Sequence, residues 1–344
     1  MTEAAPTTGI ARGSAVRPGL RRLRLAGAGV VTAAMFATSV AVAGSPGAQA
    51  APTPRSAPTA ITAGTFNINN GKAVLGNSNS RIDRVANEIR RANFDVVGIQ
   101  EANTEMRDRL MARIGNTYSY SLIGNSRGIN MTGGLIFYRR DLFYAGQNQG
   151  SILLPNPPGA QARYALYQDL YHRGSGSHFM FASTHLSAIG GRAGSDVRGS
   201  QANHMAGTIR QLNYEGLPLV LVGDMNSNRA KKYVYDAPRL ALLANGLNDA
   251  FDRTPTRRNE RFNSFNGLVR TPAVGGFRPD QVYVDGSIAV QQTEVMVRLV
   301  TVKKKVKVKV KGKTKTKVKK VALYRTPFAS DHNAIRATIV LPAQ

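Results

Sequence analysis

Runs of apolar residues separated by polar turns recur along the chain from about residue 61 and predict alternating strands and helices. Buried strands are predicted at 61–68, 94–100, 133–140, 178–186, 217–224 and 278–286, and an alternating closing strand at 333–341. Apolar positions at helical spacing predict amphipathic helices over 81–92 and 198–212. No repeat or linker interrupts this pattern, so the sequence predicts one α/β domain over residues 61–342.

Polar side chains stand at the ends of these predicted strands. They are Asn67, Glu101, His185, Asp224 with Asn226, Asp280 and the pair Asp331-His332. Any one of them alone is more often a cap or a turn former. Together, acids, amides and imidazoles without cysteine indicate a crevice at a sheet edge that holds a hard cation and handles phosphate. Oxygen ligands suit Mg²⁺, Mn²⁺ or Ca²⁺ rather than zinc.

The N-terminal fifty residues have the pattern of an export signal. Five arginines precede a weakly apolar stretch over 25–43, and Ala48-Gln49-Ala50 matches a cleavage site. We expect a signal peptide over 1–50, a Pro/Thr/Ala linker over 51–60, and a secreted monomer with no stable membrane insertion after cleavage. A single membrane anchor is the alternative, and the Arg21-Arg22 pair leaves the export route open.

The charge of the chain indicates the kind of partner. Lys and Arg total 46 against 20 Asp and Glu, a formal net charge of +26, which favours nucleic acid or another phosphodiester polyanion as partner. The chain has no cysteine, which excludes disulfides, thiol nucleophiles and Cys-ligated zinc.

A lysine-rich segment over 302–320 holds eleven lysines and no acid. Lysine occupies every odd position from 303 to 319, with Val or Thr at most of the even ones, which predicts a β-hairpin insertion over 301–322. A three-residue loop, Lys311-Gly312-Lys313, would set lysines opposite lysines on one face. A bound polyanion would relieve their repulsion, so the candidate substrate-binding residues are Lys305, Lys307, Lys309, Lys315 and Lys317. A solvated edge that prevents aggregation, or a disordered loop, is the alternative.

The motifs TFNIN, GIQE, THLSA, VGDMNSN, RPDQV and ASDH follow one another along residues 61–342. In this order they resemble the endonuclease/exonuclease/phosphatase superfamily, which includes secreted deoxyribonucleases, bacterial sphingomyelinases and inositol-polyphosphate phosphatases. Each motif alone is weak, and their order makes the resemblance specific. It implies a four-layer αββα sandwich of two mixed sheets, with the lysine-rich hairpin as an insertion and the site at one edge of the sheets.

The resemblance also implies roles for the polar residues. Glu101 is the principal metal ligand, with Asn67 and Asp331 beside it. The catalytic residues are His332, which takes a proton from the attacking water, Asp280, which orients His332, His185 on a phosphate oxygen, and Asp224 with Asn226 on the phosphate or nucleophile. Arg163 contacts phosphate, whereas Arg198 and Gln201 brace the segment after His185. The acidic residue that secreted deoxyribonucleases carry before the strand at 133–140 is missing here.

These observations predict a secreted, divalent-metal-dependent phosphodiester hydrolase, with a nonspecific endonuclease on DNA or RNA as the leading interpretation. A phospholipid phosphodiesterase of the sphingomyelinase kind is one alternative, but the segment from Val302 to Val321 has none of the aromatic residues that would insert into a membrane. A non-catalytic polyanion-binding protein is the other, and the complete set of polar residues argues against it.

Overall fold

The computed structural model describes residues 57–70, 75–121, 134–227, 236–310 and 313–344. The predicted signal peptide, most of the predicted linker and the region of the missing acidic residue lie outside this described part. The first strand, β1 (Thr59–Asn67), begins in the last two residues assigned to the linker. In the described residues, no helix combines the length and the apolar character that crossing a membrane requires.

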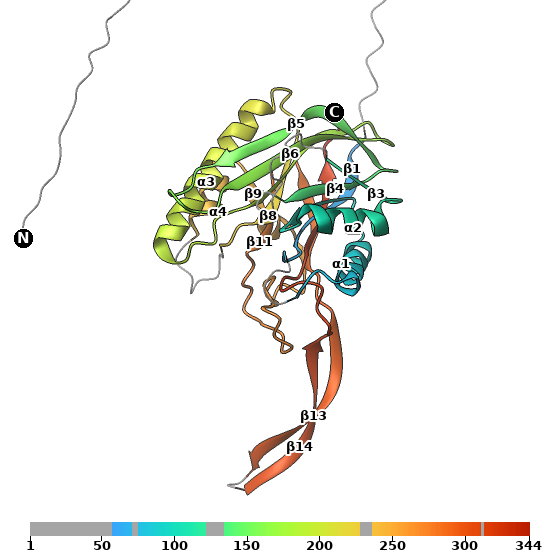
Figure 1. Ribbon diagram of the computed structural model, residues 1–344, viewed down its shortest axis with the longest axis vertical. Helices are drawn as coiled ribbons and strands as arrows, with labels where there is room; N and C mark the ends of the chain where they lie inside the picture. Colours follow the sequence, from blue (N-terminus) through green and yellow to red (C-terminus); the bar gives the residue numbers. More distant parts are fainter. Residues whose placement is uncertain (1–56, 71–74, 122–133, 228–235, 311–312) are drawn as a thin grey trace, which may run out of the picture. The chain divides into compact units, whose positions relative to one another are not determined.

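Seven strands of the described chain form the first sheet, in the order β10-β12-β15-β1-β2-β4-β3 (Figure 1). Their bounds are Thr256–Arg258 for β10, Ala289–Val295 for β12, Ile335–Leu341 for β15, Val96–Gln100 for β2, Leu135–Arg139 for β4 and Tyr118–Tyr120 for β3. The sheet is mixed, because β1 runs parallel to β2 and antiparallel to β15. The carboxyl ends of β1 and β2 therefore meet at one edge.

Six further strands form the second sheet, in the order β5-β6-β7-β8-β11-β9. Their bounds are Phe143–Leu154 for β5, Arg163–His172 for β6, His178–His185 for β7, Leu219–Asp224 for β8, Asp280–Val284 for β11 and Asn248–Asp249 for β9. β7 and β8 are parallel, while β8 and β11 are antiparallel. The end of β8 therefore lies beside the end of β7 and the start of β11.

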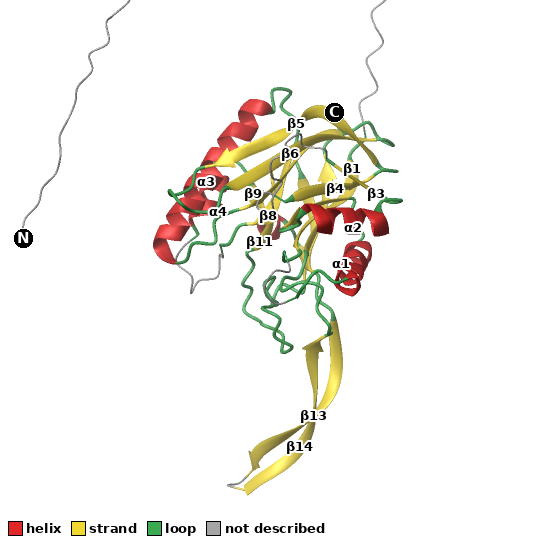
Figure 2. Cartoon of the chain, viewed as in Figure 1, coloured by secondary structure: helices red, strands yellow, loops and turns green. Residues whose placement is uncertain are grey.

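Helices cover the outer face of each sheet, which gives the predicted αββα sandwich (Figure 2). The helices are α1 (Asn79–Ala92) and α2 (Thr104–Ile114) on the first sheet, α3 (Gly191–Leu212) and α4 (Ala237–Ala244) on the second, and the short α5 (Ala250–Arg253). Apolar residues of α1 such as Val85 pack on Val97 and Phe137 of the first sheet. Met205 of α3 packs on Met180 of the second sheet.

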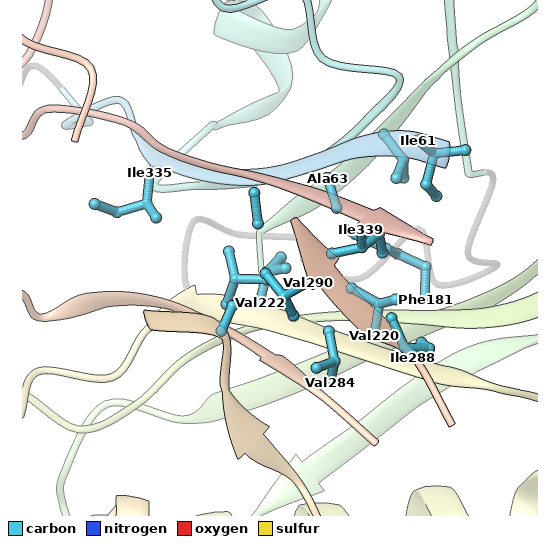
Figure 3. Packing of buried hydrophobic residues seen from close by; sticks show 14 of the residues in the cluster. Ile61, Ala63, Phe181, Val220, Val222, Val284, Ile288, Val290, Ile335 and Ile339 are labelled. Atoms are coloured by element: carbon cyan, nitrogen blue, oxygen red, sulfur yellow. The ribbon is translucent and has the colours of Figure 1, made fainter. Parts of the chain in front are cut away.

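The two sheets bury a common apolar core between them (Figure 3). Ile61 and Ile339 of the first sheet belong to the same cluster as Phe181, Val220 and Val284 of the second. Alternate residues of each strand face this core, as the twofold period of a strand requires. Because the apolar side chains of each strand lie in this core, the polar side chains that follow them are left at the strand ends.

The pattern of hydrophobic residues predicts part of this architecture. The strands that the sequence predicts are observed as β1, β2, β4, β7, β8, β11 and β15, with shifted ends. The long pair β5 and β6 is not predicted, because polar residues interrupt both strands and a register irregularity separates Ala145 from Gln149. The helix predicted to begin at 198 begins at Gly191, because a first turn of small residues hides its periodicity.

The lysine-rich strands β13 (Leu299–Val310) and β14 (Lys313–Tyr324) pair antiparallel as a two-stranded sheet, but not in the predicted register. Val310 pairs with Lys313, so two residues rather than three connect the strands. Lys305 consequently lies opposite Val318, and Lys307 opposite Thr316. Two-residue loops match the twist of paired strands, and this register keeps most lysines from facing one another directly. The side chains of Lys309 and Lys315 lie outside the described residues.

Candidate active site

Strand register brings the predicted polar residues to one edge of the two sheets. In the first sheet Asn67 pairs with Gln100, the residue before Glu101. In the second sheet Asp224 pairs with both His185 and Asp280. Side chains at paired positions of neighbouring strands lie close together. The sheets thus assemble a site from residues that are more than 200 positions apart in the chain.

His332 and Asp280 form the shortest ion pair among the described residues of this site. The His332 Nδ1 lies 2.7 Å from the Asp280 Oδ2. Burial alone would lower the pKa of His332, but the charge of Asp280 and this hydrogen bond raise the pKa to about 10. Burial raises the pKa of the Asp280 carboxyl, against the opposing charge of His332. At neutral pH the imidazole therefore carries its proton, so in this state His332 is a hydrogen-bond donor and not a base.

The pairing predicts how His332 titrates when Asp280 is replaced. In Asp280→Asn the burial remains and the carboxylate is lost, so the pKa of His332 should fall by about 1–3 pH units. NMR titration of the imidazole ring protons measures this directly. Because the folded pKa of His332 exceeds the unfolded value, its contribution to stability is complete below about pH 6.5 and disappears as the pH rises through about 10. Identical titration of His332 in both proteins would contradict the assignment.

Asp224 lies at the centre of the site. Its Oδ2 accepts a hydrogen bond from Asn67 Nδ2 at 2.9 Å and lies 3.5 Å from His185 Nε2 and 3.9 Å from His332 Nε2. Its Oδ1 accepts from the backbone N–H of Asn226 at 2.9 Å. Burial would raise the pKa of Asp224, yet the two histidines and these donors lower it. Asp224 is therefore a buried, ionised carboxylate that links both imidazoles.

His185 and Arg163 lie near Asp224 without a full set of partners. Burial lowers the pKa of His185 against the opposing charge of Asp224, and its Nδ1 has no hydrogen-bond partner within the described residues. Arg163, at the start of β6, is 7% exposed, and its guanidinium forms no hydrogen bond or ion pair with any described residue. Burial lowers the pKa of Arg163, and the charges of Asp224 and Glu101 act in the opposite direction. A buried cation without a partner fits an anionic ligand.

Glu101 and Asp331 lie on the first-sheet side of the site. Glu101 accepts hydrogen bonds from Asn67 Nδ2 and from the Asn70 N–H, each at 3.0 Å. Asp331 Oδ2 accepts from Asn69 Nδ2 at 3.0 Å. Neither carboxylate forms an ion pair among the described residues, and the cations Arg81, Arg163 and His332 act on them only over longer distances. Carboxylate oxygens without a direct ion pair, beside an amide, fit a hard divalent cation.

A second set of groups could also hold a cation. One ligand atom each from Asp224, Asp280 and His332 lies within 4.8 Å of the others, and this is the one such cluster in the described part of the chain. However, the His332 Nδ1 and Asp280 Oδ2 already bond each other at 2.7 Å. Because His332 is protonated at neutral pH, a cation bound to its Nε2 would have to displace a proton from that nitrogen, whereas Glu101 and Asp331 offer oxygens without this cost.

Several supporting residues escape detection in the sequence. Asn69 binds Asp331, and Ser330 Oγ donates to the Asn67 backbone oxygen at 2.7 Å. The ring of Phe265 packs edge-on against His332, with centroids 5.1 Å apart. The pair Asn69-Asn70 after the first strand is a signal in the sequence that could have indicated a polar role at the site. Phe265 has no such signal, because it stands in a polar loop without periodicity. Arg198 and Gln201 hold the segment after His185 through Ser187, as expected.

Arg81 of α1 is fully buried and joins the two segments that carry the site residues. Its guanidinium donates to the backbone oxygens of Ile68 and Asn69, just after β1, and to that of Ala329, just before Ser330. No acidic side chain pairs with it in the described residues. Arg81 therefore fixes the distance between these segments through backbone acceptors.

Replacing Arg81 by Met should leave these buried carbonyls without donors. Each unsatisfied buried group costs about 1–3 kcal/mol, so the free energy of unfolding should fall by about 3 kcal/mol or more. Urea denaturation measures the loss. Arg90→Met, an exposed position on the same helix, is the control and should change stability little. Equal stability of both variants would show that the Arg81 contacts contribute nothing.

Comparison with known proteins agrees with the fold. Residues 64–332 match the model of the endonuclease/exonuclease/phosphatase family. No curated protein matches the chain. Solved structures with the same fold include a family protein from Bacteroides thetaiotaomicron, with TM-score 0.62 and 21% identity, covering 83% of this chain and 98% of that one.

Two further solved structures show the same fold. The mannosyl-6-phosphatase Bt3783 of Bacteroides thetaiotaomicron VPI-5482 has a TM-score of 0.61 and 20% identity over 82% of this chain and all of that chain (100%). TDP2 of D. rerio, complexed with a single strand DNA product, has a TM-score of 0.53 and 15% identity over 82% of this chain and 99% of that one. Family members hydrolyse phosphate esters and generally depend on divalent metals. Since the family model extends over most of the domain, the chain belongs to the endonuclease/exonuclease/phosphatase family.

Proposed function

We propose that this protein is a divalent-metal-dependent phosphodiester hydrolase that acts on nucleic acid. The observation that carries the proposal is one site that combines a buried imidazole–carboxylate pair with two carboxylates that lack ion pairs. The pair is His332 with Asp280, and the carboxylates are Glu101 and Asp331. Such a site can position a water, move a proton and hold a cation beside a phosphate.

Glu101, Asn67 and Asp331 would hold the cation. Mg²⁺ is the first choice, with Mn²⁺ or Ca²⁺ as alternatives, because the donors are carboxylate and amide oxygens. When bound in such a site, a divalent cation neutralises charge on the phosphoryl oxygens and assists the leaving oxygen. It would also oppose the protonation of His332, since a nearby positive charge lowers the pKa of an imidazole.

The remaining residues act on the water and the phosphate. With its Nδ1 held by Asp280, His332 presents Nε2 to the attacking water and accepts its proton once the imidazole is neutral. Asp224 holds both imidazoles in position, and Asn226 is tied to the same carboxylate. His185 would donate a hydrogen bond to a phosphate oxygen, and Arg163 would neutralise the charge of that oxygen.

The charge of the whole chain supports nucleic acid as the substrate class. The net charge is +26 for the whole chain and +22 without residues 1–50, and either value favours a polyanion over a small neutral or zwitterionic substrate. We also propose that the protein is exported with cleavage near Ala50, and that Lys305, Lys307, Lys309, Lys315 and Lys317 contribute to substrate binding. A phospholipid substrate and a purely polyanion-binding role remain the alternatives that an assay must separate.

The test is turnover by the purified full chain of plasmid DNA, RNA, sphingomyelin liposomes, bis(p-nitrophenyl) phosphate and p-nitrophenyl phosphate, each with Mg²⁺ and with chelator. Metal-dependent cleavage of nucleic acid and of the small diester is expected. Turnover of sphingomyelin without cleavage of nucleic acid would overturn the substrate class. Turnover of the monoester alone would show a phosphatase. Tight DNA binding without turnover of any substrate would show a non-catalytic protein.

A further inference from the structure

The register of the hairpin places lysines on both of its faces. Residues directly opposite each other in an antiparallel pair project from the same face, and neighbours along a strand project from opposite faces. From the pairs of β13 with β14, the first face carries Lys303, Lys305, Lys307 and Lys320, and the second face carries Lys304, Lys317 and Lys319. All seven are exposed. The predicted register would instead have placed most of the lysines on a single face.

Nothing within the hairpin balances this charge. The segment from Val302 to Val321 contains no acid, and in the described residues β13 and β14 pair only with each other. Lys303 faces Lys320 and Lys304 faces Lys319, so two like-charged pairs lie directly opposite one another. Such pairs are destabilising, and a two-stranded sheet is marginally stable by itself. A polyanion on each face would relieve the repulsion.

The dimensions of a two-faced ribbon match one particular polyanion. A sheet with its side-chain layers is about 10 Å thick, and the major groove of B-DNA is about 12 Å wide and admits a two-stranded ribbon. Lysines two apart on one strand are about 6.7 Å apart, close to twice the 3.4 Å axial rise of a DNA strand. A ribbon standing in the groove would therefore face a phosphate wall on each side. The major groove of A-form RNA is too narrow for side chains to enter.

The residue types in the hairpin indicate that it does not recognise a particular base sequence. The segment has valine, threonine, alternating lysine and one glycine, without Arg, Asn or Gln. Arg, Asn and Gln each form paired hydrogen bonds with a base edge, and lysine, which can also contact guanine, would here face the phosphates. The segment also has no aromatic residue that would insert into a lipid surface. Its contacts would thus be electrostatic and independent of base sequence.

The base of the hairpin is tied to the site. Tyr324, the last residue of β14, is buried, and its N–H donates to the Arg270 oxygen at 2.8 Å. Its hydroxyl lies 3.3 Å from Asn333 Nδ2, and Asn333 directly follows His332. Seven residues separate Tyr324 from His332. The base of the hairpin therefore lies beside the chain segment that carries His332.

We propose that the hairpin seats in the major groove of duplex DNA, with one row of lysines toward each phosphate strand, and holds the duplex without regard to sequence. This inference rests on the proposed function for its biological meaning and deepens it, since it names duplex DNA as the substrate form.

Binding in chelator tests the inference without cleavage. Fluorescence anisotropy of the full chain is measured with a 20-base-pair DNA duplex, an RNA duplex of equal length and phosphatidylglycerol vesicles, over a series of salt concentrations. Each of two variants removes the lysine charges from one face. The first changes Lys303, Lys305, Lys307 and Lys320 to Gln, and the second changes Lys304, Lys317 and Lys319 to Gln. The matched control changes three exposed arginines at the other end of the sheets to Gln: Arg90, Arg140 and Arg173. Thermal melts confirm that each variant is folded.

Each face variant should weaken DNA-duplex binding at least tenfold at about 0.1 M salt, because it loses three or four phosphate contacts. Each lost contact should also make the slope of log K against log salt shallower by about 0.9. The control should keep the wild-type slope. An effect confined to one face, equal binding of the RNA duplex, or loss of vesicle binding alone would overturn the inference.

A separate arm tests catalysis with bis(p-nitrophenyl) phosphate and the wild-type chain. If the wild-type chain hydrolyses this diester and the face variants bind DNA as tightly as the wild type does, the hairpin role is refuted and the proposed function stands. Hairpin-dependent duplex binding without diester turnover would support the groove contact and refute the hydrolase.

Discussion

Replacing His332 by alanine should lower kcat for phosphodiester hydrolysis by about 10²–10⁴-fold, the usual contribution of a positioned general acid or base. The reason is that Nε2 of His332 lies beside Asp224 while its Nδ1 is held by Asp280, so no other described imidazole can take its place at the water. KM should change little, because the binding groups remain. Steady-state kinetics on the small diester measure both constants.

His204→Ala is the control for this prediction. His204 is exposed on α3 and outside the site, so its replacement should leave kcat within about twofold. A His332→Ala variant that retains wild-type kcat with Mg²⁺ would remove the imidazole from the mechanism. Equal losses in both histidine variants would point to a folding defect, which a thermal melt would reveal.

Glu101→Gln should lower kcat/KM by about 10²–10³-fold and raise the Mg²⁺ concentration that gives half-maximal rate. The change removes a negative charge but keeps the shape of the side chain, and the stabilisation by a bound cation is worth several kcal/mol. Initial rates over a Mg²⁺ series and calorimetric titration with Mg²⁺ measure the two effects separately.

Glu105→Gln, four residues further on, is the matched control, because Glu105 is exposed and its one ion pair among the described residues is with Arg109. An unchanged Mg²⁺ dependence in Glu101→Gln would move the cation to the Asp224, Asp280 and His332 cluster. In that case Asp280→Asn would be the variant that raises the Mg²⁺ requirement.

The positions of the site residues could be predicted because the strands that carry them have a strong local signal. The apolar run before Asp224 and the one before His185 are each long enough to predict a buried strand that ends in a polar residue. Polar groups at buried strand ends are costly unless partnered, so their repetition is informative. The ordered motifs then named the family, which the match over residues 64–332 confirms.

Contacts between distant segments could not be predicted from local pattern. Arg81 occupies a buried position of an amphipathic helix, where the hydrophobic periodicity predicts an apolar residue. Its partners Ile68 and Ala329 lie 13 and 248 residues away. The packing of Phe265 on His332 likewise depends on how a loop folds over the site.

By itself, the sequence determined the strands β1, β2, β4, β7, β8, β11 and β15, the polar residues at their ends, and the alternation of Lys with Val or Thr in the hairpin. Those features follow from side-chain periodicity and burial, which are local. Only the tertiary structure decided the register. A period of two is satisfied equally by either pairing of β13 with β14, and the two-residue connection selected the one that puts lysines on both faces. The same physics governs the site, where strand pairing, and not distance along the chain, places Asp280 beside Asp224 and His332.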